Sequence, residues 1–525
     1  MIEGDFFSRA LAEPDRVVLV MAETGASITA GELARNAIHI ATWLDKLGLA
    51  AGDRFAVLLE NRFEIPAFVY AARYAGMYAI LMSTHSTPAE VAYVVRDSGA
   101  KLLIVSERTA SLASDLGDLF GVSCWTVDDS QPGAASLKAA LSSVEGPPPD
   151  FSSRPLGRDL LYSSGTTGRP KGVFHAMLPA SFRGQTDPEA LVMAGLMGFD
   201  EHTVYLSTAP LYHAAPLRFS MRILDLGGRV VIMDRFDASA ALSFIERYKI
   251  THSQWVPTMF RRLLGLPAEI RQRHDLSSHR MAIHAAAPCP VDVKFAMLEW
   301  WGDMLFEYYA GSEGCGITVV NSEEWRRRPG TVGRPTTTIV HIVGDHGQEL
   351  PAGEIGHIYF EGGGAFSYFN DEEKTKAAFN EKGWATYGDM GYLDAEGYLF
   401  LSSRRADLIL SGGVNLYPQE IEDSLALHPN VSDVAVVGVP HVELGEVPLA
   451  VAVLAPGVEK SAETALAIID EAAKTLGRLK LPRRMVFVEE LPRLATGKLL
   501  RRKVKDEYRT EPDAGFDLRS AKKPH

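Results

Sequence analysis

Hydrophobic positions in the first half of the chain form short apolar runs separated by longer amphipathic stretches. The runs 53–59 and 101–105 flank a helical pattern that is rich in Ala and Tyr and ends at Gly76. After residue 200 the alternation returns, with apolar runs at 203–207, 228–233 and 252–256. Alternating strands and helices are typical of parallel sheets covered by helices on both faces. We therefore predict an α/β protein with two αβαβα-type subdomains.

The pattern changes at about residue 330. Short alternating runs at 338–343 and 356–360, punctuated by Gly and Asp, predict a small β subdomain over about 330–403. Strand patterns at 434–438 and 450–454 and a helical pattern at 462–476 predict a small α+β C-terminal domain over 404–512. Residues 1–403 would then form one large N-terminal domain. The polar residues 513–525 are expected to be a disordered tail.

Length and charge limit the class of protein. A chain of 525 residues is too long for one hydrophobic core, which stops growing at about 250–300 residues. Its apolar segments are interrupted well before the ~20 residues of a membrane helix, and the N-terminus lacks the basic region of a signal peptide. The net charge of −13 disfavours nucleic acid as a partner. We expect a cytoplasmic protein without an integral membrane segment.

The cysteines agree with a reducing compartment. Cys124, Cys289 and Cys315 are widely separated and lack His or Cys at metal-ligand spacing, which argues against a zinc site or a disulfide framework. Cys315 lies close to Glu313 in the sequence, so a nucleophilic thiol is an alternative, although no Cys-His pairing is visible.

The segment Tyr162-Ser-Ser-Gly-Thr-Thr-Gly-Arg-Pro-Lys-Gly172 carries the clearest chemical signal. Glycine lets the backbone turn its N–H groups toward an anion, the hydroxyls add donors, and Lys171 adds charge. A Walker A loop is excluded, because it requires Ser or Thr directly after Gly-Lys. A flexible linker is the alternative, but the adjoining apolar run 159–162 argues against it. We predict a triphosphate-binding loop that contains Ser163, Ser164, Gly165, Thr166, Thr167, Gly168 and Lys171.

This loop resembles the signature of the adenylate-forming superfamily, which comprises acyl- and aryl-CoA synthetases, luciferases and the adenylation domains of peptide synthetases. Further motifs follow in the family's order, so the resemblance covers essentially the whole chain: Pro210-Leu-Tyr-His-Ala214, Tyr309-Ala-Gly-Ser-Glu313, Tyr387-Gly-Asp389, Ser403-Arg-Arg-Ala-Asp407, Ser411-Gly-Gly-Val-Asn-Leu-Tyr-Pro418 and Pro492-Arg-Leu-Ala-Thr-Gly-Lys498. The resemblance implies an AMP-forming acyl-CoA synthetase that uses ATP, Mg²⁺ and coenzyme A.

Adenylation brings a carboxylate to the α-phosphorus of ATP, so the site needs cations against charge repulsion and donors that hold the leaving pyrophosphate in line. By resemblance, Lys498 is the catalytic lysine between the carboxylate and the α-phosphate; a surface lysine is the alternative. Glu313, with Thr167, resembles the Mg²⁺ site, and one carboxylate suffices because magnesium takes phosphate oxygens as well.

The resemblance also assigns the nucleotide and acyl contacts. Tyr309 lies against one face of adenine and Ala286 against the other. Ala310 and Ser312 line the same site. Asp389 and Arg404 contact the ribose. His213 orients the carboxylate, which carries no proton to remove. Core packing, a turn aspartate and a structural histidine are the respective alternatives for Tyr309, Asp389 and His213. The acyl pocket is assigned to His213, Trp255, Tyr308, Ala310 and Gly311.

The C-terminal domain is expected to be mobile. By resemblance it presents Lys498 for adenylation and then rotates to place Gly412 and Gly413 along the pantetheine channel. Ala406 stands at the hinge, where the family often carries Asp or Lys. Ala310 replaces the glycine that usually lines the acyl tunnel, and the extra methyl group would narrow it.

These observations predict an enzyme that activates a hydrophobic carboxylic acid as acyl-AMP and transfers the acyl group to CoA. Fatty, aryl and steroid side-chain acids all remain open as substrates. A ligase that loads acyl-AMP onto a carrier protein is one alternative, and a non-catalytic nucleotide-binding homologue is another. A second copy of the chain, in a homodimer, is a candidate partner.

Overall fold

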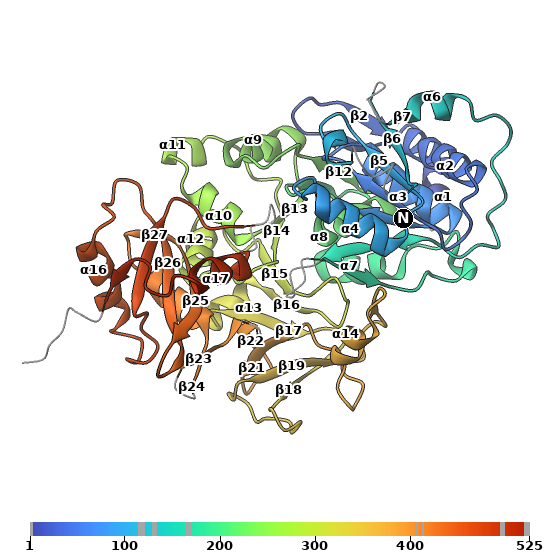
Figure 1. The fold of residues 1–525 in the computed structure, drawn as a ribbon. Coiled ribbons are helices and arrows are strands. Elements are labelled where there is room, and N and C mark those ends of the chain that lie inside the picture. The colour runs from blue at the N-terminus through green and yellow to red at the C-terminus, as the bar shows by residue number, and fades with distance from the viewer. Residues whose placement is uncertain are drawn as a thin grey trace, which may run out of the picture.

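The computed structural model describes residues 4–113, 121–128, 134–163, 170–404, 407–411, 414–493 and 499–518. Figure 1 shows an α/β body at the N-terminal end, a β subdomain beside it, and a separate C-terminal domain next to α10 and α12. This mixed α/β architecture confirms the predicted fold class.

The first α/β unit is built on a sheet with strand order β7-β6-β5-β3-β4-β8, whose paired strands run parallel. Its strands are β3 Arg54–Leu58, β4 Tyr78–Leu81, β5 Leu102–Val105, β6 Ser123–Thr126, β7 Ala135–Ser136 and β8 Arg158–Asp159. The helices of this region are α1 Phe6–Ala12, α2 Ala30–Lys46, α3 Glu64–Ala75, α4 Pro88–Ser98 and α6 Leu137–Ser142. Capping boxes at Thr29 and Thr87 define where α2 and α4 begin.

The second α/β unit has a parallel centre in the order β15-β14-β13-β11-β12-β1. Its strands are β1 Val17–Met21, β2 Ser27–Thr29, β11 Val204–Ser207, β12 Arg229–Ile232, β13 His252–Trp255, β14 Met281–His284, β15 Leu305–Tyr309 and β16 Thr318–Asn321. The helices are α7 Pro188–Met197, α8 Ala214–Asp225, α9 Ala238–Tyr248, α10 Pro257–Leu264, α11 Ala268–Arg271, α12 Val291–Trp301 and α13 Ser322–Arg327. The apolar runs predicted at 203–207, 228–233 and 252–256 are confirmed as β11, β12 and β13.

The β subdomain continues this second sheet through the pairing of β16 with β17, so that one path of 13 strands joins the two. It contains β17 Thr331–Pro335, β18 Ile339–Val343, β19 Gly356–Glu361, β21 Asp389–Leu393, β22 Leu399–Arg404 and α14 Glu372–Ala377. A separate small sheet, β9 Leu161–Ser163, β10 Lys171–Phe174 and β20 Ser367–Tyr368, links this subdomain to the phosphate-loop motif.

The C-terminal domain is built around the long hairpin of β25 Val431–His441 and β26 Gly445–Leu454. Its other elements are β23 Ile409–Ser411, β24 Val414–Leu416, α15 Pro418–Ala426, α16 Ala462–Ala472, β27 Arg484–Val488, α17 Arg501–Arg509 and β28 Phe516–Asp517. The sequence pattern placed residues 513–525 in a disordered tail. The structure differs at its start, because β28 pairs antiparallel with β27 through Arg484 and Met485.

Candidate active site

The predicted phosphate loop is framed by a β-hairpin. β9 and β10 pair antiparallel with Lys171 opposite Ser163 and Gly172 opposite Tyr162, so the two ends of the loop lie together. Lys171 therefore stands at the end of the loop as the first residue of β10. The predicted residues Ser164, Gly165, Thr166, Thr167 and Gly168 lie outside the described residues, and only the backbone of Ser163 is described.

Tyr368 connects Lys171 to Glu313. The Lys171 ammonium lies over the Tyr368 ring, 4.7 Å from its centroid, and the Tyr368 hydroxyl donates a hydrogen bond to Glu313 Oε1 at 2.9 Å. The pairing of β20 with β10, with Tyr368 opposite Val173, holds the ring beside the lysine. Sequence reasoning missed Tyr368, because its partners are 55 positions or more away along the chain and no local motif marks it.

Glu313 has the environment of a metal-binding carboxylate. It is half-buried, and Ser312 Oγ donates to its Oε2 at 3.2 Å while Tyr368 donates to Oε1. No group of three or more His, Cys, Asp or Glu side chains within the described part of the chain forms a metal cage. A single oriented carboxylate beside a phosphate loop fits magnesium, which prefers one or two carboxylates together with phosphate oxygens.

The loop that carries Glu313 is held by His175 and Arg218, which come from other elements. His175 Nε2 lies 2.9 Å from the Ser312 carbonyl oxygen, and Arg218 Nη1 donates to the same oxygen at 3.2 Å. Arg218 also pairs with the half-buried Asp159, at 2.9 Å. Burial and the nearby Arg218 lower the pKa of His175, so its neutral form donates from Nε2 to Ser312. Neither His175 nor Arg218 belongs to the motifs recognised in the sequence.

The predicted nucleotide contacts lie together at the junction of the second sheet and the β subdomain. The Tyr309 hydroxyl donates to Asp389 Oδ2 at 2.6 Å, and Asp389 is 8% exposed. In the backbone pairing of β21 with β22, Asp389 lies opposite Arg404. The Arg404 side chain lies outside the described residues. The Tyr309 ring makes an edge contact with Tyr387 at 5.6 Å. The structure thus brings Tyr309, Asp389 and the Arg404 backbone to one place.

Ala286 carries backbone strain. It lies in the turn after β14 with φ of +75°, is exposed, and is one of three non-glycine residues with positive φ in the described chain. Such a conformation costs roughly 1–3 kcal/mol and often marks a ligand-binding position. The carboxyl ends of β14 and β15 meet at the same edge of the parallel sheet, so the turns that carry Ala286 and Ala310 to Glu313 are neighbours.

Aromatic side chains cover the α8 face of the sheet next to His213. His213 is the N-cap of α8, and its ring lies 4.5 Å from that of Tyr212. The Tyr308 ring lies 5.5 Å from Phe219 of α8, and its hydroxyl accepts a hydrogen bond from Gln254 at 3.1 Å. These residues belong to the same hydrophobic cluster or contact it directly, and they form an apolar wall at the start of α8.

Trp255 does not lie with this group. Side chains alternate across a strand, and Trp255 faces away from α8, where it is 1% exposed and packs against Trp301 at 5.3 Å and Phe260 at 6.3 Å. Its neighbour Gln254 occupies the α8 face instead. Ala310 is exposed just beyond β15. A side chain at Gly311 would meet the Tyr387 ring at 2.5 Å, so this position requires glycine.

The segment that contains Lys498 is closed at its ends. Arg493 and Leu499 form an antiparallel bridge, and Arg493 pairs with Asp433 at 2.7 Å. Arg501, just beyond, forms an ion pair with buried Glu422. Lys498 itself lies outside the described residues, as do Ala406, Gly412 and Gly413.

The Cys315 alternative finds no support in the geometry. The side chain is fully buried, and burial raises the pKa of its thiol, with the charge of Glu313 adding to the effect. A raised pKa reduces the thiolate fraction that a nucleophile needs.

Comparison with known proteins identifies the family of the chain. Residues 6–369 match the family of AMP-binding enzymes, and residues 420–498 match the AMP-binding enzyme C-terminal domain. The chain belongs to this family, and within it to the AMP-forming acid–thiol ligases that make acyl-CoA through an acyl-adenylate. Among the described residues, no helix has the length and apolar character needed to cross a membrane.

Three relatives illustrate the range of this class. A long-chain-fatty-acid–CoA ligase of Mycobacterium tuberculosis is 31% identical and covers 95% of this chain and 97% of its own. A feruloyl-CoA synthase of Amycolatopsis is 32% identical over 92% of this chain and 94% of its own. The structure of o-succinylbenzoate CoA synthetase from Bacillus subtilis, in complex with its acyl-adenylate, has a TM-score of 0.80 at 29% identity and covers 96% and 99% of the two chains.

Proposed function

We propose that this protein activates a hydrophobic carboxylic acid with ATP and Mg²⁺ and then transfers the acyl group from acyl-AMP to coenzyme A. One observation carries the proposal. The connected group Lys171, Tyr368 and Glu313, the pair Tyr309 and Asp389, and the wall beside His213 converge at the carboxyl edge of the second sheet. In this proposal they would serve as the phosphate, nucleoside and acyl contacts of adenylation.

The roles follow from charge and position. Lys171 would attract the β- and γ-phosphates, and Glu313 would hold the metal, which neutralises phosphate charge when bound. Asp389 would accept hydrogen bonds from the ribose hydroxyls. His213 would orient the acid, and Lys498 would lie between its carboxylate and the α-phosphate. Because both reactants are anions, positioned cations are the main source of rate enhancement.

The apolar wall favours a hydrophobic acid. The buried rings of Phe219 and Tyr308 pack against each other between α8 and the sheet, and the polar Gln254 is already bonded to Tyr308. The two arginines of α8 nearest this wall are also paired, Arg218 with Asp159 at 2.9 Å and Arg222 with Glu189. A second carboxylate on the substrate would have to displace one of these pairs. The long-chain-fatty-acid–CoA ligase and the feruloyl-CoA synthase are named for acids with one carboxylate, whereas o-succinylbenzoate, the acid of the third relative, has two.

The test is a screen of pyrophosphate release with ATP and Mg²⁺ over alkanoic, aryl and steroid side-chain acids, followed by AMP and thioester detection with free CoA. We expect monocarboxylic acids with apolar bodies to be turned over and dicarboxylic acids of equal length to be poor substrates. Pyrophosphate release without thioester formation from CoA would favour loading of a carrier protein. The absence of acid-dependent pyrophosphate release for every acid in the screen would contradict the proposal.

A further inference from the structure

Asn61 connects the first α/β unit to the segment that precedes His213. It lies in the turn between β3 and α3 and is 4% exposed. Its amide nitrogen donates to the carbonyl oxygens of Met233, at 2.7 Å, and Ala209, at 3.3 Å. Its amide oxygen accepts the N–H of Leu211 at 2.8 Å. Both amide donors and the amide oxygen are therefore used, and all three partners belong to the second α/β unit.

Two of these bonds bracket Pro210 in the segment from Ala209 to His213. Proline has no N–H, and inside this segment the backbone closes only through the bond from His213 N–H to the Pro210 carbonyl, at 3.1 Å. The N–H of buried Leu211 is paired with Asn61. The side chain of Asn61 thus supplies the hydrogen bonds that a strand or helix would otherwise provide just before α8 begins.

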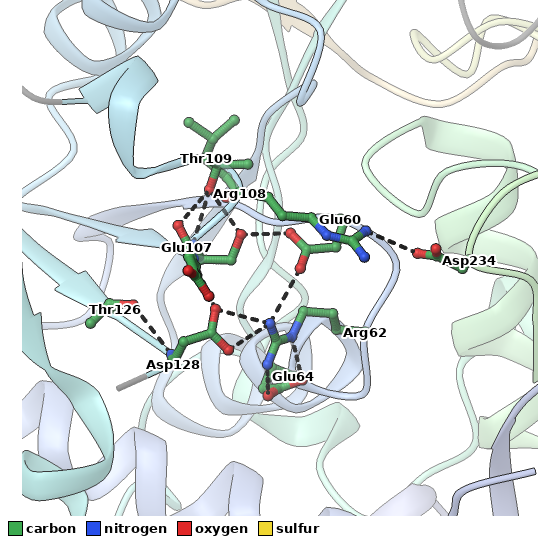
Figure 2. A network of polar contacts seen from close by, with 11 residues as sticks. Glu60, Arg62, Glu64, Glu107, Arg108, Thr109, Thr126, Asp128 and Asp234 are labelled. Carbon is green, nitrogen blue, oxygen red and sulfur yellow. Dashed lines mark hydrogen bonds and ion pairs between the residues drawn. The ribbon is translucent and has the colours of Figure 1, made fainter. Parts of the chain in front are cut away.

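The turn that carries Asn61 is itself held firmly. Arg62 forms ion pairs with Glu60 at 3.2 Å, Glu64 at 3.1 Å and Asp128 at 2.9 Å, and Figure 2 shows these side chains converging on its guanidinium. Ser106 Oγ also donates to Glu60 at 2.6 Å. Both sequence neighbours of Asn61 are therefore fixed.

A second contact crosses between the two units at the same place. Arg108 lies 3.5 Å from Asp234, the residue that follows Met233 (Figure 2). This pair is partly exposed, so it contributes little energy by itself. It shows that the network around Arg62 and the loop bonded to Asn61 are adjacent in the two units.

We propose that Asn61 is a positioning residue for adenylation, because it holds the segment 209–213 so that His213 faces the acid. This inference rests on the proposed function and on the role given there to His213. Asn61 does not touch the reacting groups; it acts through the backbone at Ala209 and Leu211. A displacement of about 1 Å in such a group can lower the rate roughly 100-fold.

The rival explanation is that Asn61 only joins the two units. Tyr70 offers a matched control, since it lies on α3, the helix that follows Asn61, and its hydroxyl bonds to Asp225 at 3.1 Å and the Met221 carbonyl at 3.4 Å. Those partners lie toward the far end of α8 from His213. Tyr70→Phe therefore removes a buried contact between the same units and leaves the segment 209–213 alone.

The experiment measures acid-dependent pyrophosphate exchange with ATP, well below the melting temperature of each protein. The proteins compared are the wild-type full chain, the single variants Asn61→Ala, Asn61→Asp, Tyr70→Phe and His213→Ala, and the double variant that combines Asn61→Ala with His213→Ala. We expect Asn61→Ala to lower kcat/KM for the acid roughly 10- to 100-fold, with KM for ATP changed less than about 2-fold. Asn61→Asp, which retains the acceptor for Leu211, should lose less. Tyr70→Phe should lower the melting temperature but keep kcat/KM within about 2-fold.

The double mutant decides between positioning and simple destabilisation. If Asn61 acts through His213, adding Asn61→Ala to His213→Ala causes no further loss. The inference would be overturned if the losses in kcat/KM of the two single variants multiply in the double variant. It would also be overturned if Tyr70→Phe loses as much kcat/KM as Asn61→Ala, or if the Asn61 variants keep the acid kinetics of the wild type. If Asn61→Ala does not fold, Asn61→Asp in both backgrounds gives the same comparison. Failure of the proposed function is seen separately: in that case none of the tested acids supports pyrophosphate exchange by the wild-type chain. That result removes this inference as well.

Discussion

At the scale of single residues, the Tyr368 hydroxyl connects Glu313 to the strands that frame the predicted phosphate loop. It is a neutral donor to a carboxylate, a type of hydrogen bond that contributes about 1.5–3 kcal/mol. Tyr368 and Lys171 lie on β20 and β10 of the same small sheet, whereas Glu313 lies in the loop after β15 of the second α/β sheet. The orientation of Glu313 therefore depends on how these units pack.

Tyr368→Phe removes this donor and keeps the ring over Lys171. We expect the Mg²⁺ concentration for half-maximal adenylation to rise by about 10-fold or more, because Glu313 loses the bond that orients it. The melting temperature should change little. Titration of Mg²⁺ at saturating ATP checks this. Tyr392→Phe, on β21 and stacked on Phe400 at 4.9 Å, is the control. An unchanged Mg²⁺ dependence would show that Tyr368 does not support the metal site.

His252 gives a residue-scale prediction about pH. It is buried in β13, its Nε2 lies 3.1 Å from the Met197 carbonyl and its Nδ1 lies 2.9 Å from Thr251 Oγ1. Burial lowers the pKa of His252 from 6.5 to about 4. The unfolded chain therefore binds a proton at a higher pH than the folded chain, and stability falls as the pH drops from about 6.5 toward 4.

His252→Gln should remove this contribution. Between pH 7 and pH 5 we expect the wild type to lose about 2 kcal/mol more stability than the variant. Urea unfolding followed by tryptophan fluorescence at the two pH values checks it, since all seven tryptophans lie within residues 1–403. The comparison uses the difference between the two pH values, so a constant cost of the substitution cancels. Equal pH dependence in both proteins would contradict a neutral buried His252.

At the scale of elements, β17 joins the second α/β sheet to the β subdomain. The strand pairs with β16 on one side and β22 on the other, and its register shifts between Thr331 and Gly333. Gly333 has φ of +95°, and a Cβ there would lie 2.0 Å from the Val319 carbonyl oxygen. Glycine is required by both conformation and space, as is common at a β-bulge.

Gly333→Ala should therefore destabilise the junction by about 3 kcal/mol or more, from steric overlap added to the cost of positive φ. Gly347→Ala is matched for the backbone alone, because Gly347 has φ of +80° and nothing within 4 Å of a Cβ. That control should cost only about 1 kcal/mol. Thermal unfolding of the two variants makes the comparison. Equal losses would mean that the contact with Val319 relaxes freely.

At the scale of the whole molecule, the C-terminal domain meets the N-terminal body at α10. Arg261 of α10 donates to the Ser432 carbonyl oxygen at 2.7 Å, and Figure 1 places this domain next to α10 and α12. The segment of Lys498 belongs to this domain, whereas Lys171, Glu313 and Asp389 belong to the body. Rotation of one domain against another about a few linker residues is the motion that the two half-reactions would use.

Lys498→Ala should abolish formation of acyl-AMP and leave thioester formation from supplied acyl-AMP intact, because the lysine is needed in only one domain orientation. The expected loss in the adenylation barrier is on the order of 3–4 kcal/mol. Pyrophosphate exchange and the reaction of synthetic acyl-AMP with CoA measure the two steps separately. Adenylation at the wild-type rate, or equal losses in both steps, would remove Lys498 from this role.

The sequence by itself determined the elements and the class of enzyme. Apolar periodicity located β11, β12 and β13 nearly to the residue, because strand and helix periods are local properties. The ordered motifs around Lys171, Glu313 and Asp389 marked the chemistry, because each is a short contiguous segment. The C-terminal boundary was less accurate: β28 is a strand only through its pairing with β27, which the polar sequence at 513–525 does not indicate.

Only the tertiary structure decided which side chains face each other. Trp255 and Gln254 are adjacent in sequence, but the pleat of β13 directs them to opposite faces, and the apolar pattern of a doubly covered strand does not reveal which is which. Tyr368 and Asn61 are separated from their partners by 55 and about 150 positions. Contacts at such distances depend on how sheets pack, and packing is a property of the folded chain rather than of any local segment.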